Sequence, residues 1–393
     1  MKLLGLRLCE HDSNISYFDG NVVHYYKSER QFQEKHHAFK NLTEWKSIVK
    51  KLWNIDHTEI DEIAIVVDPW HYGIEDKSFF PETEFNHLET PTKTTRLHHH
   101  YAHALSAWMM GESSLQIVID GFGDADIAYT VIKDNKILEV GSLKDYGSLG
   151  LEMSTVGYKF GMINTHGLDI AGKLMGLQSY GNIDYEFKQE LKPYGIRNVK
   201  EIFDYSKWEE HKGDKVFADL TKLDWIKTVH EHVGEKLVEF FSEFAEEGDT
   251  VIYSGGVAQN VLWNTLLKNK FKNLIIPPHC ADDGLSLGAI EYLRRKHNLQ
   301  KLSIDNFPYV QSDKSPDTIP TEDVFKKTAK FLAEGKIVAW YQGNGEIGPR
   351  ALGNRSILMD PRIPDGKNKI NKVKNREQYR PFGATVISEH KDK

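Results

Sequence analysis

Two stretches of this 393-residue chain combine residue types that bind charged ligands. The first reads GNGEIGPRALGNRSIL over residues 343–358 and is followed by DPR. Glycines let a backbone approach a ligand closely, and arginines hold planar oxyanions through paired hydrogen bonds. A basic run is usually a solvated surface, but the dense glycine spacing favours an anion or nucleotide site. The candidate ligands are Glu346, Arg350, Asn354, Arg355 and Ser356, together with Lys374, Arg376 and Arg380 from the basic run that follows.

The second stretch is HHHYAH, at residues 98–103. His99 and His103 are four residues apart, so a helix presents both imidazoles on one face. Two histidines at this spacing can share one metal ion. His100 and His103, three residues apart, form an alternative pair. A histidine-rich turn that binds no metal is the competing interpretation of a bare HxxxH pattern.

Carboxylates follow two apolar segments elsewhere in the chain. Asp120 ends one such segment and precedes Gly121, and Asp282 and Asp283 lie beyond another. We expect these side chains at the open ends of strands. Histidine nitrogen combined with carboxylate oxygen suits ferrous iron, manganese or zinc better than a soft copper site. Nearby Cys280 is interpreted as a packed thiol rather than a ligand.

Glycine turns mark candidate nucleotide contacts. The sequence SGGVAQN at residues 254–260 joins a predicted strand to a predicted helix, whose free N–H groups favour phosphate. Asn260 and Asn264 are four residues apart on that helix, and we expect both to face the ligand. The proposed nucleotide ligands are Gly121, Gly123, Gly255, Gly256, Val257, Asn260 and Asn264.

Three further residues are candidates for catalysis. His11 and Asp12 lie together in the first predicted turn between strands, and His11 is a candidate general base. Lys173, in AGKLMGL, is a candidate to hold a phosphate or carboxylate. A solvated lysine beside a turn is the alternative for Lys173.

Composition limits the class of protein. The chain has 57 acidic and 50 basic side chains and a formal net charge of -7, which argues against nonspecific binding to long nucleic acids. Two cysteines give no disulfide framework and indicate a reducing compartment. No segment is apolar over a length that spans a bilayer. We therefore expect a soluble cytoplasmic protein without membrane contact, and a homodimer is the default oligomer.

The pattern of elements predicts an α/β fold in two domains. A strand at residues 3–8 and a hairpin at 14–19 and 21–27 are repeated as strands 116–120, 127–132 and 137–140. This repetition is the layout of a duplicated actin-like nucleotide-binding fold. Secondary structure over residues 151–224 is ambiguous. The remaining expected elements are a helix at 226–244 ended by Gly248, strands at 250–254 and 274–276, a helix from Gly284, a linker at 306–322, and a helix at 323–334 with a strand at 337–341 that open a second domain over 323–393.

Several of these motifs also resemble one enzyme family. GPRALGNRSIL, DPR and REQYRPF look like the C-terminal part of the O-carbamoyltransferases that modify antibiotics and nodulation signals. HDS at residue 11, HHxxH at 99, GKLMGL at 172 and GGVAQN at 255 are similar to motifs of that family in the same order. The resemblance implies an actin-like domain (ASKHA class) at 1–305, of the threonylcarbamoyl-transferase type, followed by a YrdC-like α/β domain. That second domain ends early here, at Lys393, so we expect either a fragment or a shortened enzyme.

The resemblance also implies chemistry. Family members form carbamoyl adenylate from carbamoyl phosphate and ATP, with Mg²⁺ on the nucleotide, and transfer the carbamoyl group to a hydroxyl of a sugar, nucleoside or other small acceptor. It implies a metal, iron first and manganese or zinc as alternatives, held by His99, His103, Asp120 and Asp282. One departure is Ile170-Ala171, where an acidic residue often precedes the glycine. The alternatives are a non-catalytic nucleotide-binding protein and a threonylcarbamoyl or sugar-kinase-like transferase.

Overall fold

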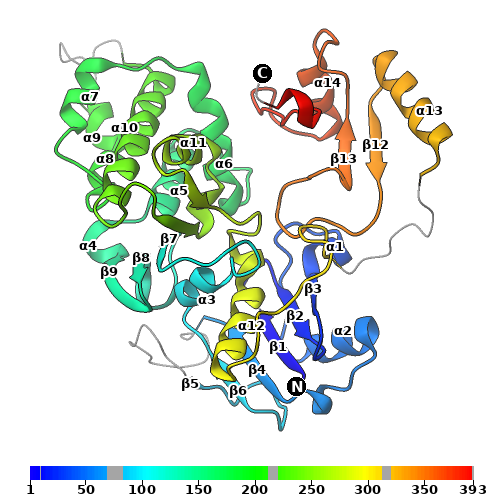
Figure 1. Cartoon of the computed structure of the whole chain (residues 1–393). Coiled ribbons are helices and arrows are strands. Elements are labelled where there is room, and N and C mark those ends of the chain that lie inside the picture. Colours follow the sequence, from blue (N-terminus) through cyan, green and yellow to red (C-terminus); the bar gives the residue numbers. More distant parts are fainter. Residues whose placement is uncertain (9, 69–82, 211–219, 312–319, 392–393) are drawn as a thin grey trace.

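Two mixed β-sheets form the body of the protein in a computed structural model that describes residues 1–8, 10–68, 83–210, 220–311 and 320–391 (Figure 1). The first sheet has the strand order β3-β2-β1-β4-β6-β5 and the second has β9-β8-β7-β10-β11. The first comprises β1 (Leu3–Arg7), β2 (Asn14–Phe18), β3 (Val23–Lys27), β4 (Glu62–Val66), β5 (Thr83–Glu84) and β6 (Thr94–Arg96). The second comprises β7 (Leu115–Ile119), β8 (Ile127–Lys133), β9 (Lys136–Ser142), β10 (Thr250–Ser254) and β11 (Asn273–Ile275).

The two sheets repeat one topology. In each, the first strand pairs antiparallel with a hairpin on one side and parallel with later strands on the other. The turn after β1 therefore corresponds to the turn after β7, and the helix after β6 corresponds to the helix after β11. The predicted duplicated actin-like α/β fold is confirmed by this order.

Local sequence explains the first hairpin. Gly20 has φ +105, a conformation that side chains with a Cβ rarely adopt. The Asp19 carboxylate accepts hydrogen bonds from the backbone of Asn21 and Val22 at 2.8 and 2.9 Å. The adjoining strands β1 and β4 bury all their residues, because both faces of this part of the sheet are covered.

Two helices occupy the space between the sheets (Figure 1). Helix α3 (His99–Leu105) packs against β7, β8 and β10, and α12 (Leu285–Lys296) packs against β1, β2 and β4. The helices also contact each other closely, because a Cβ at Gly288 would overlap the backbone carbonyl of Ala102. A Cβ at Gly5 in β1 would likewise overlap the carbonyl of Ser286. These glycines set how near α12 lies to α3 and to the first sheet.

The ambiguous region 151–224 is largely helical and covers the second sheet. Aromatic residues of this region, such as Phe187 and Trp208, form one core with β7, β10 and Trp225 of the helix that follows. The helices here are α4 (Leu143–Tyr146), α5 (Leu149–Lys159), α6 (Gly167–Leu177), η4 (Gln178–Tyr180), α7 (Tyr185–Leu191), α8 (Val199–Ile202), α9 (Tyr205–Glu210), α10 (Lys222–Ser242) and α11 (Val261–Lys270). On the first sheet lie α1 (Ser28–Phe32), α2 (Glu44–Trp53) and η1 (His57–Glu59).

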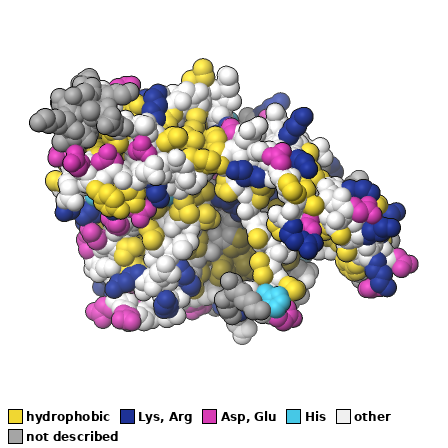
Figure 2. All heavy atoms as spheres, turned by 90° about the horizontal axis from the view of Figure 1, so that it is seen from above, with side chains coloured by type: hydrophobic (Ala, Val, Ile, Leu, Met, Phe, Trp, Pro, Cys, Tyr) yellow, Lys and Arg dark blue, Asp and Glu magenta, His cyan; other side chains and the backbone are white. Residues whose placement is uncertain are grey.

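The C-terminal part forms a separate small unit (orange to red in Figure 1). It contains α13 (Glu322–Ala333), the antiparallel pair β12 (Val338–Tyr341) and β13 (Arg355–Leu358), α14 (Gly366–Val373) and η7 (Ser388–His390). No residue of α13, β12 or β13 is buried. Helix α13 protrudes at the right edge of Figure 2, where charged and apolar side chains face solvent.

Part of the segment predicted as a linker is packed. Gln311 is fully buried, and its side-chain amide both accepts from the backbone N–H of Lys27, at 2.8 Å, and donates to its carbonyl. Ile347 is also fully buried, in the core beneath the first sheet. The segment that leads from β12 into GPRALGNRS is thus anchored on the N-terminal domain. Within the described residues, no helix has the length and apolarity to cross a membrane.

Replacing Gly288 by alanine should lower the free energy of unfolding by about 1–3 kcal/mol, because α12 must move away from the α3 backbone. The measurement is chemical denaturation. Gly172→Ala in helix α6 is the matched control, since a Cβ there meets nothing within 4 Å. Equal stability of the two variants would contradict the close approach of α3 and α12.

Candidate active site

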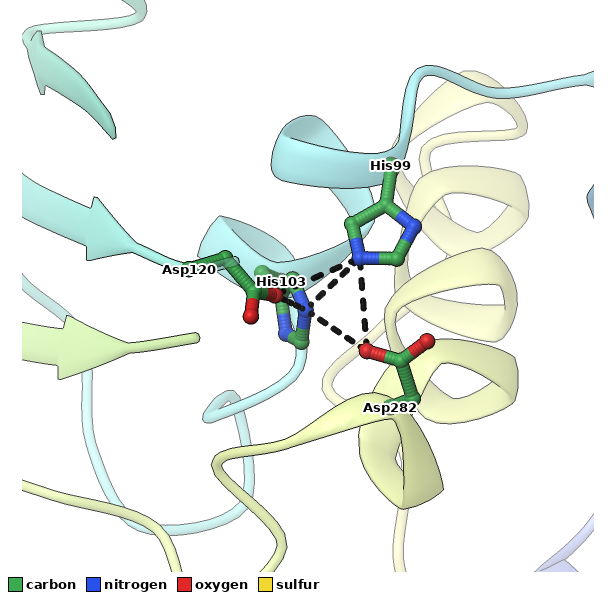
Figure 3. A group of neighbouring side chains, drawn as sticks. All are labelled: His99, His103, Asp120 and Asp282. Atoms are coloured by element: carbon green, nitrogen blue, oxygen red, sulfur yellow. Dashed lines mark hydrogen bonds and ion pairs between the residues drawn. The ribbon is translucent and has the colours of Figure 1, made fainter. Parts of the chain in front are cut away.

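Four side chains converge between the sheets (Figure 3). His103 Nε2 lies 2.9 Å from Asp120 Oδ2 and 3.4 Å from Asp282 Oδ1. His99 Nε2 lies 3.4 and 3.3 Å from the same two oxygens, and 3.1 Å from His103 Nε2. The structure thus brings together all four residues predicted as metal ligands. The alternative pair of His100 with His103 is not formed, because His100 Nδ1 is 2.9 Å from the hydroxyl of Thr130.

The ends of the repeated elements position these side chains. His99 begins α3 and Asp282 lies in the short helix η6 (Asp282–Gly284) that leads into α12, so they occupy equivalent places in the two repeats. Asp120 directly follows β7, and its Oδ1 accepts from the backbone N–H groups of Gly121 and Gly256 at 2.7 and 3.1 Å. Oδ2 is left to face the histidines. The N-terminus of α3 is held by the Asp124 carboxylate, which accepts from the backbone N–H of His99 at 3.2 Å.

The cluster is strongly coupled electrostatically. Burial lowers the pKa of His99, but Asp282 and Asp120 outweigh burial and raise it to about 10. Burial raises the pKa of both carboxyl groups, yet the histidines hold the pKa of Asp120 and of Asp282 well below the usual range. Arg7, nearly fully buried, adds a contact of 3.1 Å to Asp282 Oδ2. Both aspartates are therefore ionised, as ligands of a cation must be.

The donor set fits a divalent transition metal. Two imidazole Nε2 atoms and two carboxylate oxygens lie within 4.8 Å of one another, from buried side chains on three separate segments. This is the nitrogen and oxygen ligand chemistry of iron, manganese or zinc sites. Such a metal would take the place of the protons that now join histidine to aspartate.

Beside this cluster lies a pair formed by His11 and Asp12. His11 Nδ1 lies 3.0 Å from Asp12 Oδ2, and His11 Nε2 lies 3.7 Å from Asp282 Oδ2. The turn that holds them follows β1, which corresponds to the turn after β7 that holds Asp120. The repeated topology thus places the candidate base His11 and the candidate metal ligand Asp120 on equivalent turns of the two sheets.

The predicted nucleotide glycines lie around Asp120. Gly255 has φ +94, and a Cβ there would overlap the backbone of Ile119. Space is open next to Gly121, whereas a Cβ at Gly123 would meet His100. These turns let backbone N–H groups lie at the edge of the metal cluster.

The other nucleotide candidates have structural contacts of their own. Asn260 caps α11 by accepting from the backbone of Leu262 and Trp263, and its amide nitrogen lies 2.9 Å from His230 Nε2. Asn264 donates to the carbonyl of Ala258 at 2.7 Å, and Val257 is buried in the core. The expectation that Asn260 and Asn264 face a ligand together stays a prediction.

In the C-terminal motif, Glu346 organises the loop. Its Oε1 accepts hydrogen bonds from three backbone N–H groups, those of Leu352, Asn354 and Arg355, at 2.9 to 3.0 Å. The Arg355 guanidinium donates to the carbonyls of Gln342 and Gly343 and lies over the ring of Tyr341. Asn354 donates to the carbonyl of Asn344, and the Ser356 hydroxyl accepts from the N–H of Gly353. These four side chains shape the loop, and their predicted contacts with substrate stay predictions.

Arg350 reaches from this loop to the N-terminal domain. Its Nη2 donates to the carbonyl of Gln259 at 3.3 Å, in the turn that contains Gly255 and Gly256. A Cβ at Gly348 would overlap the carbonyl of Pro278, so the loop lies directly on that domain. Arg350 therefore borders the predicted nucleotide site.

The second basic run lies close to Arg350. Burial, then Arg380 and Arg350, lowers the pKa of Arg376, which indicates cations close together. Desolvation, and then the neighbouring Arg376 cation, lower the pKa of Lys374, whose side chain is exposed. An assembly of this kind attracts anions.

The predicted catalytic Lys173 joins α6 to this C-terminal segment. It forms an ion pair with Glu377 and donates to the hydroxyl of Thr165 at 2.6 Å. Gly176, one helical turn on, leaves room for Tyr379 and Pro381.

Two family models match the chain. The carbamoyltransferase N-terminus model matches residues 84–290, and the carbamoyltransferase C-terminus model matches residues 329–393. The chain belongs to the carbamoyltransferase family. All four residues of the candidate metal cluster lie within the N-terminal match, and Arg350 lies within the C-terminal one.

Three curated relatives align with 55% to 78% of this chain. Nodulation protein NolNO of Sinorhizobium fredii is 28% identical over 78% of this chain and 49% of its own length. Nodulation protein NolO of Bradyrhizobium diazoefficiens is 29% identical over 75% of this chain and 59% of its own length. The 3'-hydroxymethylcephem-O-carbamoyltransferase of Streptomyces clavuligerus is 31% identical over 55% and 44%. The chain thus spans about half the length of the curated relatives it matches.

Solved structures give fold-level likeness only. The activator of 2-hydroxyisocaproyl-CoA dehydratase from Clostridium difficile aligns with 77% of this chain at 14% identity and a TM-score of 0.43. A ROK hexokinase from Thermus thermophilus aligns with 75% at 14% identity and a TM-score of 0.36. At these scores the likeness bears on neither ligand nor activity.

Sequence reasoning missed several contacts of charged residues at the site. Arg7 interrupts the apolar first strand, and that interruption was the signal for its contact with Asp282. Asp283 pairs with buried Lys27 at 3.2 Å, and burial raises the pKa of Asp283 to about 6. His36 also contacts Asp169, with its Nε2 3.5 Å from Asp169 Oδ1. No local sequence pattern predicts the contact between His36 and Asp169.

The substitution His103→Ala should remove stoichiometric metal from the purified protein, because one of four converging ligand atoms is lost. Metal analysis by plasma mass spectrometry after reconstitution with ferrous iron checks this outcome. His24→Ala, at an exposed histidine paired with Asp19, is the control and should bind as much metal as the unmodified protein. A His103→Ala protein that keeps its full metal content would remove this cluster from consideration as the site.

Proposed function

We propose that this protein transfers a carbamoyl group from carbamoyl adenylate to a hydroxyl of a small acceptor. The observation that carries the proposal is the His11–Asp12 pair, with His11 Nε2 only 3.7 Å from a carboxylate of the metal cluster. A base and a cluster for a cation are what attack by an alcohol on an activated carbonyl requires. The name of the Streptomyces clavuligerus relative, an O-carbamoyltransferase, supports the same reaction class.

The transfer step can be assigned to atoms. The acceptor oxygen forms a bond to the carbamoyl carbon, and its proton passes to His11 Nε2. The bond between that carbon and the phosphate oxygen breaks, and AMP leaves with the electron pair. The Asp12 carboxylate accepts a hydrogen bond from the Nδ1–H of His11, stays ionised, and stabilises the imidazolium that forms.

A divalent metal, iron, manganese or zinc, would supply a Lewis acid that polarises the reacting group. The protein residues that would hold it are His99, His103, Asp120 and Asp282. Backbone N–H groups of the turns at Gly121 and Gly256 lie beside Asp120, where they can orient the nucleotide.

We further propose that the C-terminal unit forms the adenylate from carbamoyl phosphate and Mg²⁺-bound ATP. The support is the group of Arg350, Lys374, Arg376 and Arg380, which offers positive charge for phosphate oxygens next to the N-terminal domain.

The first experiment incubates the chain with ATP, carbamoyl phosphate and ferrous iron and follows products by mass spectrometry. Carbamoyl adenylate and pyrophosphate support both proposed steps. Their absence, together with AMP release from supplied carbamoyl adenylate, would restrict the function to transfer. If the chain binds ATP in calorimetry but forms no carbamoyl adenylate and releases no AMP from supplied carbamoyl adenylate, it is a non-catalytic nucleotide-binding protein.

Arg350→Ala should weaken binding of AMP roughly 10- to 100-fold, the loss expected from one hydrogen bond between charged groups. Titration calorimetry measures the affinity. Arg362→Ala is the matched control, because Arg362 is exposed and pairs only with neighbouring Asp360 among the described residues. Equal affinities for the two variants would place the nucleotide away from Arg350.

A further inference from the structure

His36 connects the turn after β1 to helix α6. On one side, its Nδ1 lies 3.2 Å from Asp12 Oδ2, the oxygen that also faces His11. On the other side, its Nε2 lies 3.5 Å from Asp169 Oδ1 at the start of α6. The ring also stacks on His166, the residue that caps α6, with centroids 4.7 Å apart. The single imidazole of His36 thus contacts both the turn after β1 and the N-terminal end of helix α6.

The backbone at both ends of the Asp12 contact is held in an unusual conformation. Asp12 has φ +53 and His36 has φ +57, in the left-handed region that side chains with a Cβ seldom adopt. Hydrogen bonds fix both: Asp12 N–H donates to the His36 carbonyl at 3.4 Å, and His36 N–H donates to Glu29 at 3.0 Å. Strain of this kind persists only where surrounding contacts determine it, and it concentrates at functional sites.

We propose that His36 is a positioning residue for carbamoyl transfer, which holds Asp12 against His11 and ties that arrangement to α6 through Asp169. This inference rests on the transfer function proposed above. His36 itself touches neither the cluster of His99, His103, Asp120 and Asp282 nor, in our assignment, the reacting atoms.

The chemical reason is the choice of tautomer. A carboxylate only accepts hydrogen bonds, so the contact of His11 Nδ1 with Asp12 requires the proton on Nδ1 and leaves the Nε2 lone pair free. If Asp12 turned away, neutral His11 would lose this bias, and part of it would carry its proton on Nε2, where a base cannot accept another. Since His36 donates to the same oxygen, it keeps Asp12 in place.

Charge supports this role. Burial lowers the pKa of His36, but its hydrogen bonds to Asp12 and Asp169 prevail and raise it to about 9. Near neutral pH both ring nitrogens therefore carry protons and donate, one to each aspartate. Lys35 also pairs with Asp169, which balances the second carboxylate.

The test reads the tautomer of His11 directly, by nitrogen-15 NMR of histidine-labelled full chain with Zn²⁺ added, since Zn²⁺ is diamagnetic. The His11 resonance is assigned by its loss in His11→Gln. At about pH 8, where an ordinary histidine is neutral, the unmodified protein should show the Nδ1–H tautomer. His36→Leu should move both nitrogen shifts of His11 toward the average of the two tautomers.

Two conservative variants separate the contacts of His36. Asparagine places an amide nitrogen where Nδ1 lies and tolerates positive φ, so His36→Asn should restore the Nδ1–H signal. Glutamine places its amide nearer the Nε2 position, so His36→Gln should resemble His36→Leu. The histidine in a surface pair, His24 with Asp19, gives a matched control: His24→Leu should leave His11 unchanged.

Unchanged His11 shifts in His36→Leu, or an Nε2–H tautomer in the unmodified protein, would overturn the proposal. If His36→Leu does not fold, a His36→Asn signal that differs from the unmodified one would overturn it equally. None of these readings requires turnover. A protein that shows the expected tautomers but releases no AMP from carbamoyl adenylate would contradict the proposed function and leave the positioning role of His36 standing.

Discussion

The contact between α3 and α12 is the constraint on which the rest of the site depends. These helices follow equivalent strands of the two repeats and pack in the layer between the sheets. Gly288 allows the α12 backbone to reach the carbonyl of Ala102. Because His99 begins one helix and Asp282 precedes the other, that approach sets the distance between ligands contributed by the two repeats. If a methyl group at position 288 pushed α12 away from α3, Asp282 would move away from His99 and His103.

Electrostatics then decides which charges this narrow layer can hold. Two buried carboxylates repel each other, and burying each one away from water is costly. Asp282 is compensated by His99 and by buried Arg7, and Asp120 is compensated by backbone N–H groups and by His103. A divalent cation can replace the protons on the histidines without any loss of compensation. The same residues would therefore form ion pairs without a metal and be ligands of the metal that we propose.

The C-terminal unit adds anion-binding groups to this core but few buried contacts of its own. The Glu346 carboxylate holds the glycine-rich loop by accepting hydrogen bonds from three of its backbone N–H groups. In this loop the Arg350 side chain is directed at the turn that contains Gln259. Since α13, β12 and β13 bury no residue, the loop owes its placement to contacts with the N-terminal domain. The groups proposed to form the adenylate therefore lie next to the groups proposed to transfer the carbamoyl group.

The sequence by itself indicated the first strand and the hairpin of each repeat, and the histidine pair of the metal site, because apolar periodicity, turn residues and HxxxH spacing act over a few residues. It did not predict β4, β6 or β13, and the two aspartates joined the ligand set through the family resemblance. It also determined the glycine-rich loop, although not that Glu346, Asn354 and Arg355 bind its backbone. Tertiary structure alone decided the link from Asp12 through His36 to Asp169, the ion pair of Lys173 with Glu377 and the reach of Arg350 to Gln259. Each of these contacts joins residues that are far apart in the sequence. The packing of whole helices and sheets brings their side chains together, and no local sequence pattern encodes which side chains then meet.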